Sequence, residues 1–206
     1  MSHDPYSQGG GFYPPASGGA AAGVFRGFDA KLPAFTPAGT GGFVTRWVAS
    51  IAYASVWVVG AVAGAISANG SAADEAAGVM TLCAMVPLLV YVLASLTWIY
   101  QSWDFLPYEM RRTASGRTIS PGEAAGALFI PLYNLYWMFV IAPGLCDALN
   151  AALAQQGRPQ SAPRQLAVAA CVVQIVPYIN WLVGPVLWIT YMFMVDRAKR
   201  DLTRTS

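Results

Sequence analysis

Charged side chains are scarce in this chain of 206 residues. Asp, Glu, Lys and Arg make up 11% of the residues, compared with about 25% in a typical soluble domain. Twelve basic residues against ten acidic ones leave a net charge of +2, which is too small to predict nucleic acid as a partner. Because 56% of the residues are hydrophobic, the composition argues against an ordinary soluble domain.

Histidine and cysteine are also rare, which argues against catalysis and metal binding. His3 is the one histidine, and there are three cysteines, Cys83, Cys146 and Cys171. These counts argue against a zinc site and a disulfide framework, although a Cys146–Cys171 bridge stays open because pairing cannot be deduced from sequence. The chain has no glycine-rich phosphate loop and no H-E-x-x-H motif, so we expect no enzyme activity and no cofactor.

Four long apolar stretches dominate the sequence. They cover approximately residues 47–68, 76–100, 121–145 and 166–195, and each reaches the roughly 20 residues that a membrane-spanning helix needs. We therefore predict an all-α membrane protein, with a bundle of four transmembrane helices in residues 43–206. The fourth stretch has 30 residues, so it must tilt, kink or protrude.

The third apolar stretch begins with a helix-capping signal. Ser120 is a preferred N-cap residue, and Pro121 suits the first helical position. Glu123 follows the cap by three residues and can return a hydrogen bond to it. The pattern predicts a helix that begins at Pro121.

Residues 1–42 differ from the rest in composition. They contain ten Gly and five Pro and show no hydrophobic period. Such a segment buries too little apolar surface to offset its ordering entropy, so we predict a disordered tail. Its scattered aromatic residues leave two interpretations open, a solubilising leader and an arm that binds a partner.

The basic residues predict the orientation in the membrane. With the N-terminus inside, ten Lys and Arg residues fall in cytoplasmic segments, and only Arg158 and Arg164 fall in outer loops. Positive residues concentrate on the cytoplasmic side of membrane proteins. We therefore expect a multi-pass protein of the inner membrane with both termini in the cytoplasm.

The third and fourth stretches share a Pro-x-x-Asn motif, formed by Pro131 with Asn134 and by Pro177 with Asn180. At about 1.5 Å per helical residue, both asparagines fall near the middle of a hydrocarbon core about 30 Å thick. Because proline has no backbone donor, the carbonyl group four residues before each proline would lose its helical partner. The motif therefore predicts a polar centre deep in the membrane.

Two roles are open for this polar centre, near which Gln174 also lies. The asparagine amides can bond to each other or to freed backbone and so fix helix packing, which is the role we favour. Alternatively, proline-interrupted segments in oppositely directed helices are typical of a transporter's substrate site. No charged residue or histidine lies deep in any stretch, which argues against a proton-coupled pump.

Gly60 and Gly64 form a Gly-x-x-x-Gly pattern in the first stretch. Small residues at this spacing allow another helix to approach closely. We expect the pattern to serve packing within the bundle, with self-association as the alternative.

Aromatic and basic residues follow one another between the second and third stretches, in the order Trp103, Arg111, Arg112 and Arg117. This order is typical of a short helix on the surface of an anionic leaflet. A surface that docks a partner protein is the alternative.

Residues 98–150 resemble a group of uncharacterised bacterial four-span membrane domains. The resemblance rests on the aromatic helix end from Trp98, the Ser-Pro-Gly before the next helix, the F-I-P-x-x-N-x-Y-W run from Phe129 to Trp137, and the ending from Gly144 to Asn150. Some members carry a GYF-like domain ahead of the spans, where this chain has its Gly/Pro-rich tail. The resemblance implies a bacterial inner-membrane protein and supplies no active-site residues.

These features predict a non-enzymatic interaction or accessory subunit of an envelope complex. Its partners would be membrane lipids and other membrane subunits, or further copies of itself. The alternative is a small oligomeric transporter or channel with its polar site at Asn134 and Asn180.

Overall fold

The computed structural model describes residues 35, 40–67, 73–113, 115–176 and 178–204. Within these residues the structure is helical apart from its turns and one isolated bridge between Arg112 and Thr118, which confirms the all-α class. The predicted tail lies outside the described residues, except for Phe35 and the first residues of a helix. The elements are α2 (Thr40–Ser67), α3 (Ala73–Asp104), η1 (Tyr108–Met110), α4 (Pro121–Gly126), η2 (Ala127–Phe129), α5 (Tyr133–Gln155), α6 (Arg164–Ile175), α7 (Ile179–Leu182) and α8 (Gly184–Thr203).

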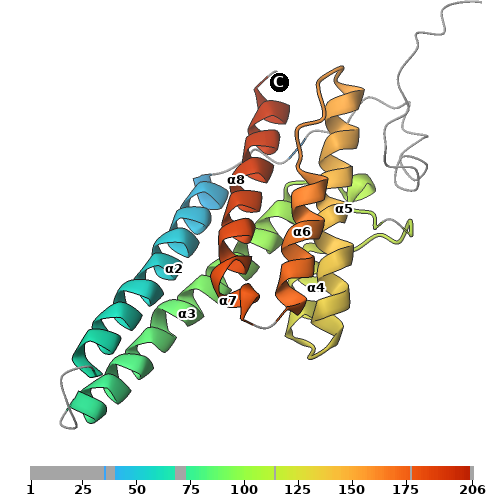
Figure 1. The fold of residues 1–206 in the computed structure, drawn as a ribbon. Coiled ribbons are helices and arrows are strands. Elements are labelled where there is room, and N and C mark those ends of the chain that lie inside the picture. The colour runs from blue at the N-terminus through green and yellow to red at the C-terminus, as the bar shows by residue number, and fades with distance from the viewer. Residues whose placement is uncertain (1–34, 36–39, 68–72, 114, 177, 205–206) are drawn as a thin grey trace, which may run out of the picture.

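Helices α2 and α3 form a long antiparallel hairpin that contains the first two predicted spans (Figure 1). Ala49, Ala52 and Ala63 are buried on α2, and their small side chains let the two helices pack closely along their length. The helices have 28 and 32 residues, or about 42 and 48 Å at 1.5 Å per residue. The hairpin extends well beyond the other helices (Figure 1).

The predicted third span is a second hairpin, not one helix. Helices α4 and η2 lead to residues 130–132, where the chain reverses, and α5 runs back beside them (Figure 1). The indole N–H of Trp137 donates to the carbonyl oxygen of Ala124 at 3.1 Å, whereas residues 13 apart in a straight helix are about 20 Å apart. The prediction of a continuous helix over residues 121–145 was therefore wrong.

The start of α4 agrees with the capping signal. The hydroxyl of Ser120 accepts a hydrogen bond from the backbone N–H of Glu123 at 3.0 Å, and the helix begins at Pro121. The Glu123 carboxylate forms an ion pair with Arg117. The capping prediction is confirmed for the Ser120 side chain.

The predicted fourth span is likewise a hairpin. The chain direction after Tyr178 is opposite to that of α6, and α7 and α8 run back beside α6 as an almost continuous rod (Figure 1). A Cβ atom on Gly184 would lie 3.9 Å from a methyl group of Val173, whereas a straight helix would separate these residues by about 16 Å. The prediction of one helix over residues 166–195 was wrong for the same reason.

The two reversals share one backbone geometry, and both use the Pro-x-x-Asn motif. The residue before each proline is extended, with φ −84° at Ile130 and −88° at Val176, which is the conformation that a following proline favours. The residue after each proline has positive φ, 64° at Leu132 and 66° at Tyr178. The backbone N–H of each motif asparagine then donates to the carbonyl four residues earlier, at 3.0 and 3.1 Å. The motif is therefore a chain-reversal motif, not a kink in a spanning helix.

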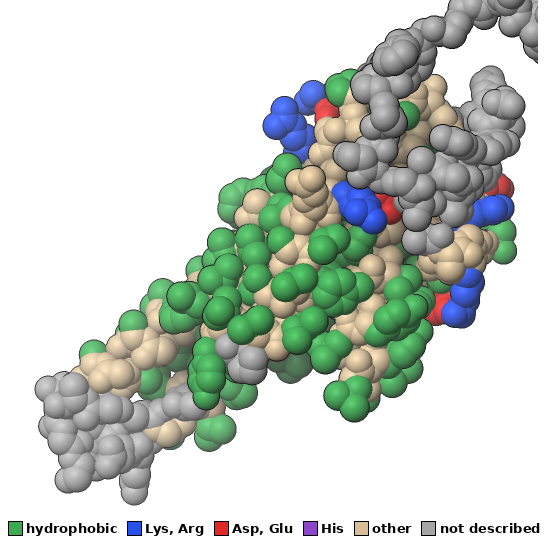
Figure 2. Space-filling view, turned by 45° about the vertical axis from the view of Figure 1, so that its right-hand side comes forward, with side chains coloured by type: hydrophobic (Ala, Val, Ile, Leu, Met, Phe, Trp, Pro, Cys, Tyr) green, Lys and Arg blue, Asp and Glu red, His purple; other side chains and the backbone are tan. Residues whose placement is uncertain are grey.

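Charged and apolar side chains occupy opposite ends of the molecule (Figure 2). The charged end comprises residues 104–123, the C-terminal halves of α5 and α8, and the connection at 156–163, and it contains the large buried side chains Trp98, Trp103 and Tyr191. The apolar end comprises the two reversals, where the exposed side chains are Phe129, Leu132, Tyr136, Tyr178 and Trp181. Leu132 and Tyr178 are 82% and 88% exposed, which is costly in water and favourable in lipid.

Among the described residues, three helices are long and apolar enough to cross a membrane. They lie in residues 42–66, 78–104 and 133–155, that is, in α2, α3 and α5. The structure thus indicates a membrane protein with three candidate spanning helices where four were predicted. The difference arises because each of the last two apolar stretches is divided by a reversal.

Candidate functional site

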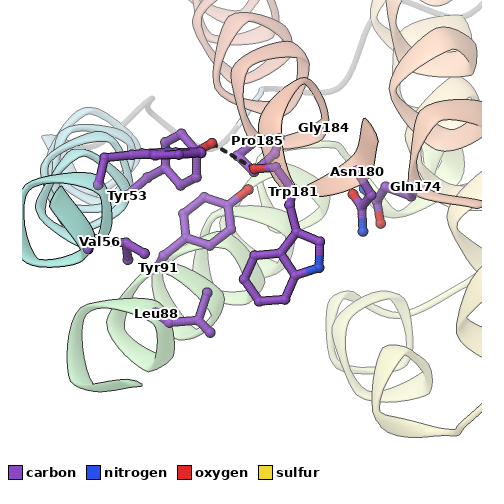
Figure 3. Close-up of a pocket in the computed structure, with 11 residues that line it drawn as sticks. Tyr53, Val56, Leu88, Tyr91, Gln174, Asn180, Trp181, Gly184 and Pro185 are labelled. Atoms are coloured by element: carbon purple, nitrogen blue, oxygen red, sulfur yellow. Dashed lines mark hydrogen bonds between the residues drawn. The ribbon is translucent and has the colours of Figure 1, made fainter. Parts of the chain in front are cut away.

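A cavity of about 400 Å³ lies between the α2/α3 hairpin and the reversal that joins α6 to α7 (Figure 3). We call it cavity A. Aromatic, aliphatic and amide side chains from five helices form its walls, which contain no charged residue. They are Tyr53, Val56, Trp57, Gly60, Leu88, Tyr91, Gln174, Asn180, Trp181, Gly184 and Pro185.

A hydrogen bond across cavity A connects α2 to α7. The hydroxyl of Tyr53 donates to the carbonyl oxygen of Trp181 at 2.9 Å (Figure 3). The rings of Tyr53 and Tyr91 lie beside each other, with centroids 5.6 Å apart. Three aromatic side chains from α2, α3 and α7 therefore frame one side of the cavity.

The amides of Gln174 and Asn180 lie side by side on the other side of cavity A (Figure 3). The Asn180 side chain lies directly over Gly184, where an added Cβ atom would be 2.4 Å from Oδ1. Only glycine leaves room for this amide position. Cavity A thus contains two amide groups, and the placement of the Asn180 amide depends on the backbone of α8.

A second cavity of about 310 Å³, cavity B, lies between α3, η2 and α5. Its walls include Ser95, Asn134 and Trp188, and it shares Tyr91 and Gln174 with cavity A. The predicted polar centre is therefore divided between two cavities, with Asn180 in one and Asn134 in the other. Gln174 borders both.

The two asparagines do not join each other as we favoured from the sequence. Among the described residues, the side-chain amides of Asn134, Gln174 and Asn180 make no hydrogen bond. The carbonyl groups of Ala127 and Val173, which were expected to lose their partners, accept from the backbone N–H three residues later at 3.3 and 3.2 Å. The expectation of freed carbonyls was wrong because a tight turn, not a kinked helix, follows them.

Pro131 takes part in the first reversal. The carbonyl of Pro131 accepts from the backbone N–H of Tyr133 at 2.7 Å, and Pro131 itself is exposed. Pro177 lies outside the described residues. Sequence reasoning missed the aromatic side of the site (Tyr53, Tyr91 and Trp181), because no pattern within one stretch shows that α2 faces a reversal between α6 and α7.

A buried ionic cluster at the charged end joins α2, α3 and α8. Asp196 accepts hydrogen bonds from Arg46 at 3.2 Å, from Lys199 at 3.0 Å and from the indole of Trp98 at 3.1 Å. Lys199 also donates to the hydroxyl of Ser102 at 2.6 Å. The three charged residues are 2–6% exposed, so the cluster buries two positive charges with one negative charge.

The segment between α3 and α4 is not a helix lying on a membrane surface. Trp103, near the end of α3, is 1% exposed and packs against Gly144 of α5, and the segment that follows folds as a 3-10 turn and a bridge. Arg111 donates to the carbonyls of Leu106 and Asp104 at 2.8 and 2.9 Å, which fixes the turn. The predicted lipid-facing role of Trp103 was wrong because Trp103 and the following Phe105 are buried in the core.

Other basic residues of the segment also have partners within the chain. Arg112 donates to the carbonyl of Glu109 at 3.1 Å, and Arg117 pairs with Glu123. Phe35, the one described residue of the predicted tail apart from α2, stacks on Phe105 with ring centroids 5.4 Å apart. This part of the charged end is therefore internally connected.

The small residues and cysteines have simple environments. Gly60 and Gly64 are exposed, and a Cβ atom on either would meet nothing within 4 Å. Among the described residues, therefore, no other helix packs closely against either glycine, contrary to what we expected from the sequence. Cys83 is an exposed free thiol, and Cys146 and Cys171 are buried free thiols.

Comparison with known proteins identifies the family. A domain of unknown function, DUF4328, matches residues 63–170, which is more than half of the 206 residues. The match includes α3, the segment between α3 and α4, and the first Pro-x-x-Asn reversal, and it ends before Gln174 and the second reversal. No curated protein and no solved structure matches the chain. The chain belongs to the DUF4328 family.

Proposed function

We propose that this protein crosses the membrane with the α2/α3 hairpin alone, while the other two hairpins enter the bilayer from one side and return. The descending arm of each of these two hairpins is shorter than the hydrocarbon core is thick. The descending arms of these hairpins, residues 121–129 and α6, contain nine and twelve residues, or about 14 and 18 Å. A hydrocarbon core about 30 Å thick is too thick for either arm to cross, so both reversals would lie near the middle of the bilayer.

The distribution of charge supports this arrangement. In a four-span protein Arg158 and Arg164 would lie on the outer side. In the hairpin arrangement all ten described Lys and Arg residues belong to one side of the membrane. By the positive-inside rule this side is the cytoplasm. The protein would therefore be an inner-membrane protein with both termini in the cytoplasm.

Within this arrangement, the protein acts as a non-enzymatic interaction or accessory subunit that associates with another membrane-embedded chain. The observation that carries this proposal is the exposed outer half of the α2/α3 hairpin, which extends beyond the other helices. There a Cβ atom added to Gly64 would meet nothing within 4 Å, and Val58 and Leu82 are 64% and 71% exposed. A helix face with small residues allows close packing of a second helix in lipid.

The test is gentle purification of the full chain from native membranes, followed by mass spectrometry of the intact assembly. We expect a stoichiometric second subunit, which would be lost in a Gly64→Leu variant and kept in a matched Val58→Leu variant. Gly64 suits this test because it does not line cavity A. A chain that is monomeric in native membranes, or an assembly unaffected by Gly64→Leu, would contradict the proposal.

A small oligomeric transporter or channel is the second candidate. It is favoured by one observation, the lack of hydrogen-bond partners for the Asn134, Gln174 and Asn180 amides among the described residues. In that case replacing both asparagines by Leu would abolish transport in vesicles and leave assembly intact. Loss of assembly or stability alone would favour a structural role.

A further inference from the structure

The strongest unassigned feature is the combination of groups in cavity A. Flat aromatic side chains lie on one side, and the amides of Gln174 and Asn180 lie on the other (Figure 3). The hydroxyl of Tyr53 already donates to a backbone carbonyl, so the N–H donors on the cavity walls are the amides of Gln174 and Asn180 and the indoles of Trp57 and Trp181. Neither amide has a hydrogen-bond partner among the described residues.

Because cavity A lies deep in the membrane in the proposed arrangement, amides without hydrogen-bond partners there are energetically unfavourable. Tyr53 lies seven residues after Arg46 on α2, and Tyr91 lies seven residues before Trp98 on α3. Seven helical residues span about 10 Å, so the cavity is about that far from the ionic cluster, toward the apolar end. In the proposed membrane arrangement this depth is within the hydrocarbon, where a polar group without a partner is unfavourable.

The lining also restricts the chemistry of an occupant. Cavity A has no charged side chain among its lining residues, so a phosphate or carboxylate head would be buried without a counter-charge. Aromatic walls favour a flat ring, since stacked and edge-to-face ring contacts are stabilising. The amide N–H groups call for carbonyl acceptors on that ring.

We propose that cavity A binds the head group of a lipid-soluble quinone. The two amides donate hydrogen bonds to a quinone carbonyl oxygen, the ring packs against the aromatic side, and the isoprenoid tail extends into the surrounding lipid. A volume of about 400 Å³ is in the range of small-molecule sites. This inference rests on the proposed membrane arrangement but not on the docking role of the α2/α3 hairpin.

The experiment uses the full chain in lipid nanodiscs that contain increasing amounts of ubiquinone as the probe. Quinones quench indole fluorescence, and Trp57 and Trp181 line the cavity. We expect a saturable quenching component in the natural protein. Asn180→Leu and Gln174→Leu should each weaken it by about tenfold, which corresponds to about 1.4 kcal/mol for one lost hydrogen bond.

Two further variants separate binding from folding. Gly184→Ala retains every polar group but displaces the Asn180 amide, so it should weaken quenching as Asn180→Leu does. Asn134→Leu changes the equivalent asparagine in cavity B and should leave the quenching unchanged. Thermal unfolding of each variant shows whether the fold is retained.

Three outcomes would overturn the proposal. The first is quenching that rises linearly with quinone content in the natural protein, as collisions in the bilayer would give. The second is saturable quenching that Asn180→Leu and Gly184→Ala leave unaltered while Asn134→Leu removes it. The third is displacement of the quinone by equimolar diacylglycerol, which would assign the cavity to neutral glycerolipids.

Discussion

Asp196 is the acid that two buried cations share, so its replacement should be far more harmful than that of an exposed acid. Arg46 and Lys199 both donate to its carboxylate, at 3.2 and 3.0 Å, and all three residues are less than a tenth exposed. Asp196→Ala would leave two positive charges buried without a counter-charge. Removing one partner from a buried pair costs about 3–5 kcal/mol.

The expected size of the effect follows from the length of the chain. For proteins of 150–250 residues, each kcal/mol lowers Tm by about 2–4 °C. Asp196→Ala should therefore lower the Tm of the full chain in detergent by roughly 6–20 °C. Lys199→Met should have a much smaller effect, because it leaves Arg46 and Asp196 as a balanced pair.

An exposed ion pair provides the matched control. Asp104 pairs with Arg111 at 3.2 Å, but its side chain is 49% exposed, and exposed pairs contribute at most about 1 kcal/mol. Asp104→Ala should therefore shift Tm by only a few degrees. Equal losses from Asp196→Ala and Asp104→Ala, or a larger loss from Lys199→Met than from Asp196→Ala, would refute the charge argument.

Three further predictions test the hairpins and the charged end. The variant Gln160→Cys, between α5 and α6, should react with an impermeant thiol reagent only from the cytoplasmic side. Ser71→Cys, between α2 and α3, should react only from the other side. Labelling of both variants in intact cells would refute the hairpin arrangement. Leu132→Gly should lose about 1 kcal/mol less stability than Leu135→Gly, because glycine relieves the positive φ at the reversal; equal unfolding transitions would contradict this. Burial lowers the pKa of Lys199 from its ordinary value of 10.5, against the raising effect of the neighbouring carboxylate. Because the unfolded chain then binds more protons, the stability should rise as the pH increases from the lowered pKa toward 10.5, and Lys199→Met should lack this rise in thermal unfolding.

Composition and capping could be read from the sequence because they depend on local properties. The scarcity of charge predicts the apolar helices, and Ser120 followed by Pro121 predicts the start of α4. The two alanine-rich helices of the first hairpin also follow from hydropathy alone. Local signals of this kind do not report which helices lie side by side.

The reversals could not be predicted from hydropathy, because a hairpin in lipid and a straight span have the same apolar composition. What distinguishes them is the backbone after each proline. A bulky residue with positive φ costs about 1–3 kcal/mol, so sequence reasoning does not place Leu132 or Tyr178 there. The duplicated motif is the available signal, but it predicts a kink because proline inside an apolar run usually kinks a helix.

For the same reason, the sequence predicts the amide residues of the candidate site but not its aromatic residues. Asn134, Gln174 and Asn180 are conspicuous as amides in apolar stretches, and the structure places each of them on a cavity wall. Their aromatic neighbours are ordinary membrane residues until the hairpins bring them together, as Tyr53 reaches the carbonyl of Trp181, 128 residues later in the chain. Because the second reversal, and not a straight helix, faces α2, the amide at its base faces an aromatic side chain and not the other asparagine. Both the division of the polar centre into two cavities and the ligand chemistry of cavity A therefore follow from the chain reversals.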